Sequence, residues 1–124
     1  MKIYEIEIFE TADGKCPYSE WLDDLKDKAA QAKIMIRIER ASLGNMSKVE
    51  SVGAGVNEFK INFGPGYRVY FGLDEGRQKI ILLLSGGTKK RQQKDVDQAQ
   101  AYWKEAKAEK LAERRSKHAK KKLS

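Results

Sequence analysis

A β-hairpin is encoded by NEFKINFGPGYRVYF, the stretch of residues 57–71 that decides the fold. Apolar and polar side chains alternate on both sides of Gly64-Pro65-Gly66, and a period of two residues is the pattern of a β-strand. The register that follows from a three-residue turn pairs Phe63 with Tyr67, Asn62 with Arg68, Ile61 with Val69, and Lys60 with Tyr70. One face of the hairpin is therefore apolar and suited to a core, and the other face is polar.

The polar face of this hairpin gathers groups that can act on a phosphate. It consists of Glu58, Lys60, Asn62, Arg68 and Tyr70. Arginine binds a phosphate through two parallel hydrogen bonds, a lysine whose pKa is depressed by neighbouring cations can serve as a base, and tyrosine can orient a group or stack on a nucleobase. These groups suit metal-free cleavage of RNA by its own 2′-hydroxyl. They equally suit a half-solvated sheet face that carries a cross-strand polar cluster.

The rest of the chain predicts a small α+β domain around the hairpin. The expected elements are a strand over residues 2–9, a helix from Pro17, a second helix over about 28–43, the two hairpin strands, a third strand over 79–85 that Gly86-Gly87 ends, and a final helix after Arg91. Residues 46–57 are expected to form an irregular, mobile connection. The order is strand, helix, helix, a three-stranded antiparallel meander, and a C-terminal helix. The third strand is apolar at five successive positions, which predicts that both of its faces are covered.

Positive charge is concentrated in two places. The net charge is +7, and residues 104–124 contain nine Lys or Arg against three Glu. A second cluster, Lys89-Lys90-Arg91 with Lys94 close behind, follows the third strand of the meander. Such clusters suit an anionic partner such as nucleic acid or an acidic peptide. We expect a domain over residues 1–110 and a basic, flexible tail over 111–124.

Several classes of protein are disfavoured by the composition. The longest apolar run, residues 80–84, is too short for a membrane helix, and the N-terminus does not look like a signal peptide, so a cytoplasmic protein with no membrane partner is expected. A single cysteine, Cys16, precludes an intramolecular disulfide, and a single histidine, His118, disfavours both a histidine-rich metal site and a Ser-His-Asp triad. We therefore expect no metal and no cofactor, with chemistry carried by lysine, arginine, tyrosine or carboxylates.

Two stretches of the chain resemble a known family of bacterial toxins. The hairpin sequence of residues 57–71 and the segment LLLSGGTKKRQQKDV at residues 82–96 are similar to the core motif of the RelE/ParE toxin superfamily. The resemblance is strongest to its HigB-like, "addiction module killer" group, which has similar GPGYRVYF and LLxGGxK segments; Pro17 followed by Trp21-Leu22 also fits this group. The resemblance spans roughly residues 2–106 and implies a RelE-like fold.

The resemblance implies a toxin of a type II toxin–antitoxin pair. RelE-like members enter the ribosomal A site and cleave mRNA with basic residues, which inhibits translation. The implied partners are the ribosome, mRNA and a cognate antitoxin, for which a helix-turn-helix type is expected. The residues expected to be catalytic are Lys60, Arg68, Lys89 and Arg91. For the family's basic residue that follows the last strand, the resemblance implies Lys89, with Lys90 or Arg91 as alternatives. Those expected to bind RNA are Asn62, Tyr70, Lys90 and Lys94.

One departure from the family pattern leaves alternatives open. Several relatives have a catalytic tyrosine or histidine near the C-terminus, whereas this chain has Gln92, Gln93 and Asp95 in that region. The acid–base assignment is therefore open. The alternatives are a ParE-like poison of DNA gyrase, which cuts no RNA, and a catalytically inactive binding module with the RelE fold.

Overall fold

The computed structural model describes residues 1–76 and 78–123, and it describes side chains as far as Lys110. The elements, in chain order, are β1 (Glu5–Ile8), α1 (Pro17–Asp24), α2 (Lys28–Ser42), β2 (Val49–Gly53), β3 (Val56–Ile61), β4 (Tyr67–Glu75), β5 (Lys79–Thr88), the short 3-10 helix η1 (Lys89–Arg91) and α3 (Gln92–Leu123). The predicted α+β class is confirmed.

The strands form one mixed sheet of five strands in the order β1-β5-β4-β3-β2. β3, β4 and β5 are antiparallel neighbours, but the expected three-stranded meander is only part of the sheet, because β2 continues it beyond β3. β1 joins the far side of β5 in parallel. It is shorter than the predicted strand because the N–H groups of Ile3 and Tyr4 bond instead to the Ser42 carbonyl at the end of α2.

The prediction of an irregular connection over residues 46–57 is wrong, because this segment contains β2. β2 pairs antiparallel with β3 and places Val49 opposite Phe59. The turn between the two strands has Ala54 at φ 53° and Gly55 at φ 82°. Positive φ at both central residues is the mark of the tight turn whose twist matches a two-stranded ribbon. Alanine is rare in such a position, so the sequence gives a weak signal for this hairpin.

The expected break at Gly86-Gly87 is also wrong. β5 continues to Thr88, with Gly86 opposite Val69 and Gly87 opposite Arg68. A side chain at Gly86 would collide with the ring of Trp21 on α1, and one at Gly87 would collide with the carboxylate of Asp95 on α3. The two glycines therefore allow a helix to approach each face of the strand rather than ending it.

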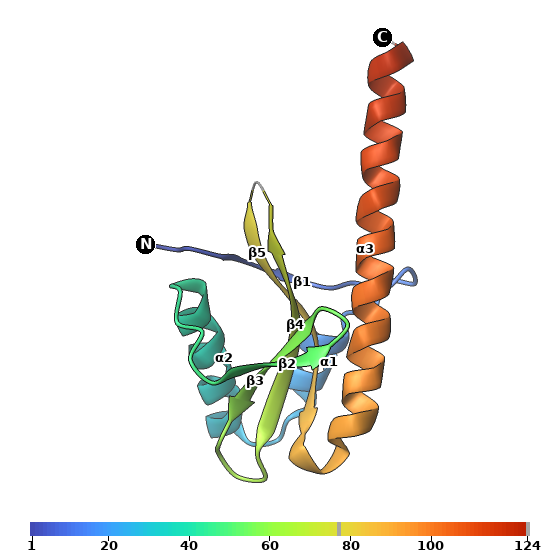
Figure 1. Cartoon of the computed structure of the whole chain (residues 1–124). Helices are drawn as coiled ribbons and strands as arrows, with labels where there is room; N and C mark the ends of the chain where they lie inside the picture. Colours follow the sequence, from blue (N-terminus) through green and yellow to red (C-terminus); the bar gives the residue numbers. More distant parts are fainter. Residues whose placement is uncertain (77, 124) are drawn as a thin grey trace.

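Helices cover both faces of the sheet, with α2 and α3 on opposite sides (Figure 1). One core lies between the sheet and α1 and α2, and includes Ile34, Phe59 and Ile81. A second core lies under α3, and includes Tyr70 and Leu84. The prediction that β5 is covered on both faces is therefore confirmed.

The predicted tail over residues 111–124 lies outside the residues whose side chains are described, although the backbone of α3 extends to Leu123. Within the described part of the chain, no helix is both long enough and apolar enough to cross a membrane.

Candidate functional site

The register of the β3–β4 hairpin brings Lys60 and Arg68 together. Ile61 lies opposite Tyr67, and Lys60 lies opposite Arg68. The predicted pairs of Asn62 with Arg68 and of Lys60 with Tyr70 are therefore wrong. The connection is five residues long, closed by a bond from the Gly66 N–H to the Phe63 carbonyl. Because the register moves by two residues, each side chain keeps its predicted face of the sheet.

A basic pocket opens at the end of this hairpin. It has a volume of about 280 Å³ and is lined by Lys60, Asn62, Gly66, Tyr67, Arg68 and Lys89. Lys89, at the start of η1, is held there because its backbone N–H bonds to the Gly66 carbonyl at 3.1 Å. Four of the predicted site residues, Lys60, Asn62, Arg68 and Lys89, therefore line one cavity although they come from three segments of the chain.

The other predicted basic residues lie outside the lining of this pocket. Lys90 and Arg91 are exposed on η1, and Lys94 is exposed on the first turn of α3. η1 begins at Lys89, so these residues follow the pocket directly along the chain. They form a solvent-facing basic cluster that follows the end of β5.

Tyr70 does not share the exposed polar patch, and that part of the prediction is wrong. Its side chain is fully buried in the second core, where α3 covers the sheet. Burial raises the pKa of the Tyr70 phenol, and the charges of Glu58 and Asp95 raise it further, while Arg68 lowers it. The phenol therefore stays protonated near neutral pH, and its ring is not available to stack on a nucleobase.

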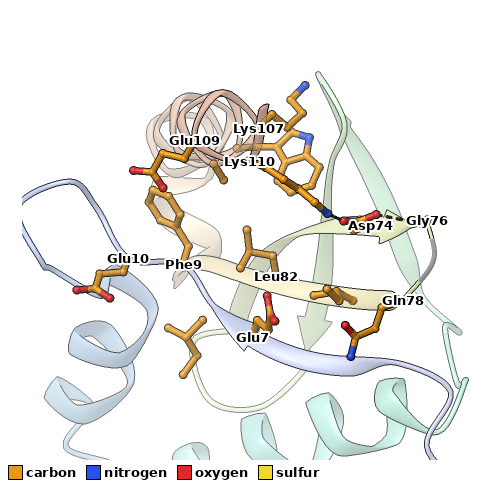
Figure 2. A pocket seen from close by; sticks show the side chains of 14 residues that line it. Glu7, Phe9, Glu10, Asp74, Gly76, Gln78, Leu82, Lys107, Glu109 and Lys110 are labelled. Carbon is orange, nitrogen blue, oxygen red and sulfur yellow. Dashed lines mark hydrogen bonds and ion pairs between the residues drawn. The ribbon is translucent and has the colours of Figure 1, made fainter. Parts of the chain in front are cut away.

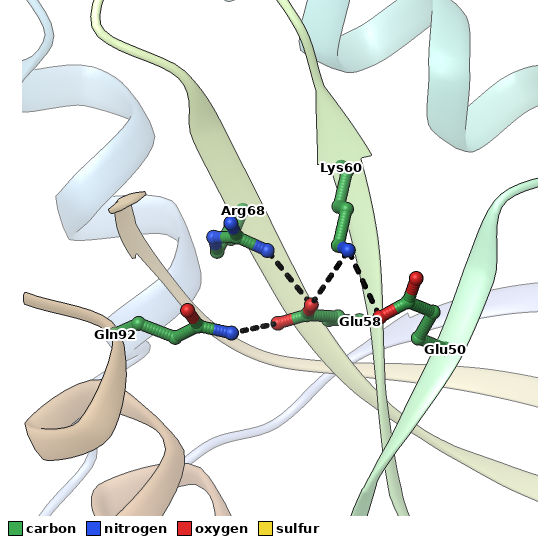
Figure 3. Close-up of polar contacts among 5 residues, drawn as sticks. All are labelled: Glu50, Glu58, Lys60, Arg68 and Gln92. Carbon is green, nitrogen blue, oxygen red and sulfur yellow. Dashed lines mark hydrogen bonds and ion pairs between the residues drawn. The ribbon is translucent and has the colours of Figure 1, made fainter. Parts of the chain in front are cut away.

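A buried carboxylate, Glu58, connects the two central basic residues. Its side chain is 1% exposed, and its Oε1 accepts a hydrogen bond from Arg68 Nη1 at 2.8 Å. The same oxygen lies 3.9 Å from Lys60 Nζ, and Oε2 accepts a bond from Gln92 Nε2 at 3.4 Å (Figure 3). Glu58 therefore fixes Arg68 and steadies Lys60 at the wall of the pocket.

Glu58 was expected on the polar face of the hairpin, but no role was predicted for it. The available signal was its position two residues before Lys60 on a strand, where both side chains share a face. A second acid, Glu50 on β2, forms an ion pair with Lys60 at 2.9 Å between Oε2 and Nζ. This ion pair was not predicted, because residues 46–57 were expected to be irregular and Glu50 lies on β2.

The guanidinium of Arg68 is bound by Glu58 through Nη1, and not all of its N–H donors have a partner among the described residues. Its side chain is 10% exposed, and Nη1 is engaged by Glu58. Its Nε is buried and has no hydrogen-bond partner among the described residues. Because Arg68 also lines the basic pocket, its guanidinium has N–H donors near a position where a phosphate oxygen could bind.

Further buried polar groups lie where the start of α3 covers the sheet. Tyr70 Oη, Ser85 Oγ and Asp95 Oδ2 are all buried without a hydrogen-bond partner in the described part of the chain. Tyr70 and Ser85 face each other across β4 and β5. Burial raises the pKa of the Asp95 carboxyl, although Arg91 and Lys94 act in the opposite direction.

The cations lining the pocket suit binding of an anion. Lys60, Arg68 and Lys89 line it, and Glu58 offsets part of their charge. Among the described residues there is no group of three or more His, Cys, Asp or Glu side chains that could hold a metal ion. The arrangement can hold a phosphate group and stabilise added negative charge on it.

Comparison with known proteins identifies a relative of this chain. No family model matches the sequence. A Haemophilus influenzae protein, described as an uncharacterized protein, is 43% identical over 82 residues, which cover 66% of this chain and 81% of the relative. At this identity and coverage, the chain belongs to the same family as that Haemophilus influenzae protein.

Proposed function

We propose that this protein is a HigB-like toxin of the RelE/ParE superfamily, the toxin of a type II toxin–antitoxin system. In this proposal it is a ribosome-dependent mRNA endonuclease, which cleaves RNA without a metal through attack of the 2′-hydroxyl and so inhibits translation. The observation that carries the proposal is the basic pocket, where Lys60, Asn62, Arg68 and Lys89 meet. The meander and C-terminal helix support the RelE-like topology.

Each basic residue has a role that follows from its position. Arg68, fixed by Glu58, holds the scissile phosphate through its remaining donors. Lys60 acts on the 2′-hydroxyl or steadies the charge that grows on the phosphate. Lys89 or Arg91 assists the leaving group. The 2′-oxygen forms a bond to phosphorus as the bond to the 5′-oxygen breaks, and the proton lost by the 2′-hydroxyl is balanced by one gained by the 5′-oxygen.

The exposed basic cluster supplies the attachment to the substrate assembly. Lys90, Arg91 and Lys94 are solvent-facing beside the pocket and suit contacts with the phosphate backbone of mRNA or ribosomal RNA. These phosphate contacts do not depend on the RNA sequence, and they make the affinity for RNA depend on salt.

A cognate antitoxin, of the helix-turn-helix type, would bind the free toxin and inhibit it.

The proposal is tested by producing the full chain in a bacterium and measuring amino-acid incorporation into new protein. Translation should stop, and Arg68→Ala should weaken the effect about 100-fold, as expected when a charge-stabilising group is lost. Lys89→Gln is a second variant. The Lys89 side chain is exposed, so this substitution leaves buried packing intact, and a loss of toxicity would not be due to misfolding. Lys79→Gln, at the other end of β5, is the matched control and should leave toxicity unchanged.

Other outcomes would support a different function. If translation continues while the DNA-damage response rises, the chain acts as a ParE-like gyrase poison. If neither process changes, the chain is an inactive binding module with this fold. Either result would refute the proposed endonuclease.

A further inference from the structure

A second hollow lies on the face of the sheet that α3 covers, beside the edge strand β1. It has a volume of about 640 Å³ and lies between β1, Gly76 and Gln78 beside the ends of β4 and β5, and the middle of α3 (Figure 2). Its apolar wall includes Phe9, Leu82 and Trp103. None of the residues that line the basic pocket lines this hollow.

The hollow adjoins an unpaired sheet edge. β1 is the outermost strand on this side, and the Phe9 N–H beside it bonds inward to the Leu83 carbonyl at 2.9 Å. Successive residues of a strand direct their backbone groups to alternate edges. The N–H and C=O groups of Ile6 and Ile8 therefore point outward, where another strand could pair with them.

The charges on this edge are acidic, although the protein as a whole is basic. Glu7, Glu10 and Glu109 line the hollow and make no ion pair with a described side chain. Of the two described cations that line the hollow, Lys110 pairs with Asp74, and the Lys107 ammonium lies 5.7 Å from the centre of the Trp103 ring. Among the described lining residues, three carboxylates without an ion pair therefore outnumber one such ammonium, which makes this lining negative.

These charges determine what can occupy the edge. A second copy of β1 pairing with the first would place Glu5 and Glu7 of each chain against those of the other, and like charges directly opposite are destabilising. A strand with Lys or Arg on the side facing α3 would place opposite charges there instead. Its other face would cover Ile8, which is 46% exposed.

We propose that the β1 edge is a docking site for an extended polypeptide segment from another protein, in which basic and apolar residues alternate. The segment adds a sixth strand beside β1 through the backbone of Ile6 and Ile8. Its basic side chains pair with Glu7 and the other acids of the hollow, and its apolar side chains pack on Ile8. This inference does not depend on the endonuclease activity, because it concerns a separate surface.

The test is a selection of random nine-residue peptides, displayed on phage, against the full chain. The selected peptides should include a class with Lys or Arg at every second position and apolar residues between them. Synthetic peptides of this class should bind the wild-type chain and bind Ile8→Pro about tenfold more weakly. Proline at position 8 removes an outward N–H without breaking a bond to β5, and edge positions tolerate it.

Matched variants separate this site from other causes. Ile8→Val keeps both the outward N–H and an apolar side chain and should retain most of the affinity, whereas Glu7→Lys should lose it. Lys89→Gln, in the basic pocket, should bind these peptides like the wild type, so the outcome is independent of the toxin proposal. Absence of an alternating basic class, or equal binding to Ile8→Pro, would overturn the inference. A wild-type dimer that Ile8→Pro dissolves would also overturn it, because the occupant would then be a second copy.

Discussion

Replacing Glu58 should destabilise the protein more than replacing any exposed acid of the same sheet. Glu58→Gln keeps the shape of the side chain but removes the charge that balances Arg68. Glu58 is 1% exposed, its bond to Arg68 Nη1 is 2.8 Å long, and the Arg68 side chain is only 10% exposed. Breaking a buried ion pair on one side costs about 3–5 kcal/mol, because the remaining charge is left without its partner.

The lower end of that range applies here. Arg68 borders an open pocket, so water can solvate part of the guanidinium, and the amide oxygen of glutamine can still accept a hydrogen bond. We therefore expect Glu58→Gln to lower the free energy of unfolding by about 3 kcal/mol. The measurement is equilibrium unfolding in urea, with the slope of the transition compared between variants to confirm two-state behaviour.

Three further variants isolate the ion pair. Glu50→Gln removes the other acid that contacts Lys60, but this side chain is 61% exposed, and the variant should unfold close to the wild type. Glu58→Leu combined with Arg68→Met replaces both charges by apolar groups and should recover most of the stability lost in Glu58→Leu alone. A Glu58→Gln variant as stable as Glu50→Gln would refute the view that this carboxylate is buried against Arg68.

Three other predictions concern Asp95 on α3, the contact between β5 and α1, and the tail. Burial raises the pKa of the Asp95 carboxyl, so its carboxylate form destabilises the fold above that pKa, and this penalty vanishes as the pH falls through it. Asp95→Asn should therefore raise the melting temperature at neutral pH, and the gain should close towards about pH 4. Asp97→Asn, at an exposed side chain, should change the melting temperature little. Gly86→Ala should cost about 1–3 kcal/mol in urea unfolding because its new methyl group meets the Trp21 ring, and adding Trp21→Leu should make the loss less than the sum of the two. Ending the chain at Lys110 removes six Lys or Arg and one Glu. RNA affinity in a filter-binding assay should fall at low salt, and the difference from the full chain should shrink as salt rises. The melting temperature should be nearly unchanged, whereas a melting temperature several degrees lower would show that α3 packs on the domain beyond that residue.

Much of the fold could be predicted because its signals are local. The alternation in β3 and β4 assigns each side chain to a face even when the register is wrong by two residues, since two is the period of a strand. Pro17 at the start of α1 and the spacing of Ile34 and Ile38 in α2 are likewise local signals, and these helices are confirmed.

What could not be predicted depends on contacts between distant residues. Tyr70 is buried because α3 crosses its face of the sheet, and a period of two does not show which face a later helix will cover. Glu58 is 1% exposed, and one of its contacts is a hydrogen bond from Gln92 at the start of that helix, 34 residues away in the sequence. Lys89 reaches the pocket through the Gly66 carbonyl, a bond between residues 23 positions apart. β2 was not predicted, because its turn has Ala54 at positive φ, a conformation that an alanine in the sequence does not indicate.

The central claim is tested most directly by the chemistry of the RNA ends produced during translation. In a purified bacterial translation system, the full chain should cut the mRNA within ribosomes and leave a 2′,3′-cyclic phosphate, or the 3′-phosphate formed from it, opposite a 5′-hydroxyl. These ends follow from attack by the 2′-hydroxyl, and they should be lost with Arg68→Ala and reduced with Lys89→Gln. Intact mRNA, or cut ends that carry a 3′-hydroxyl and a 5′-phosphate, would contradict the proposed reaction at the basic pocket.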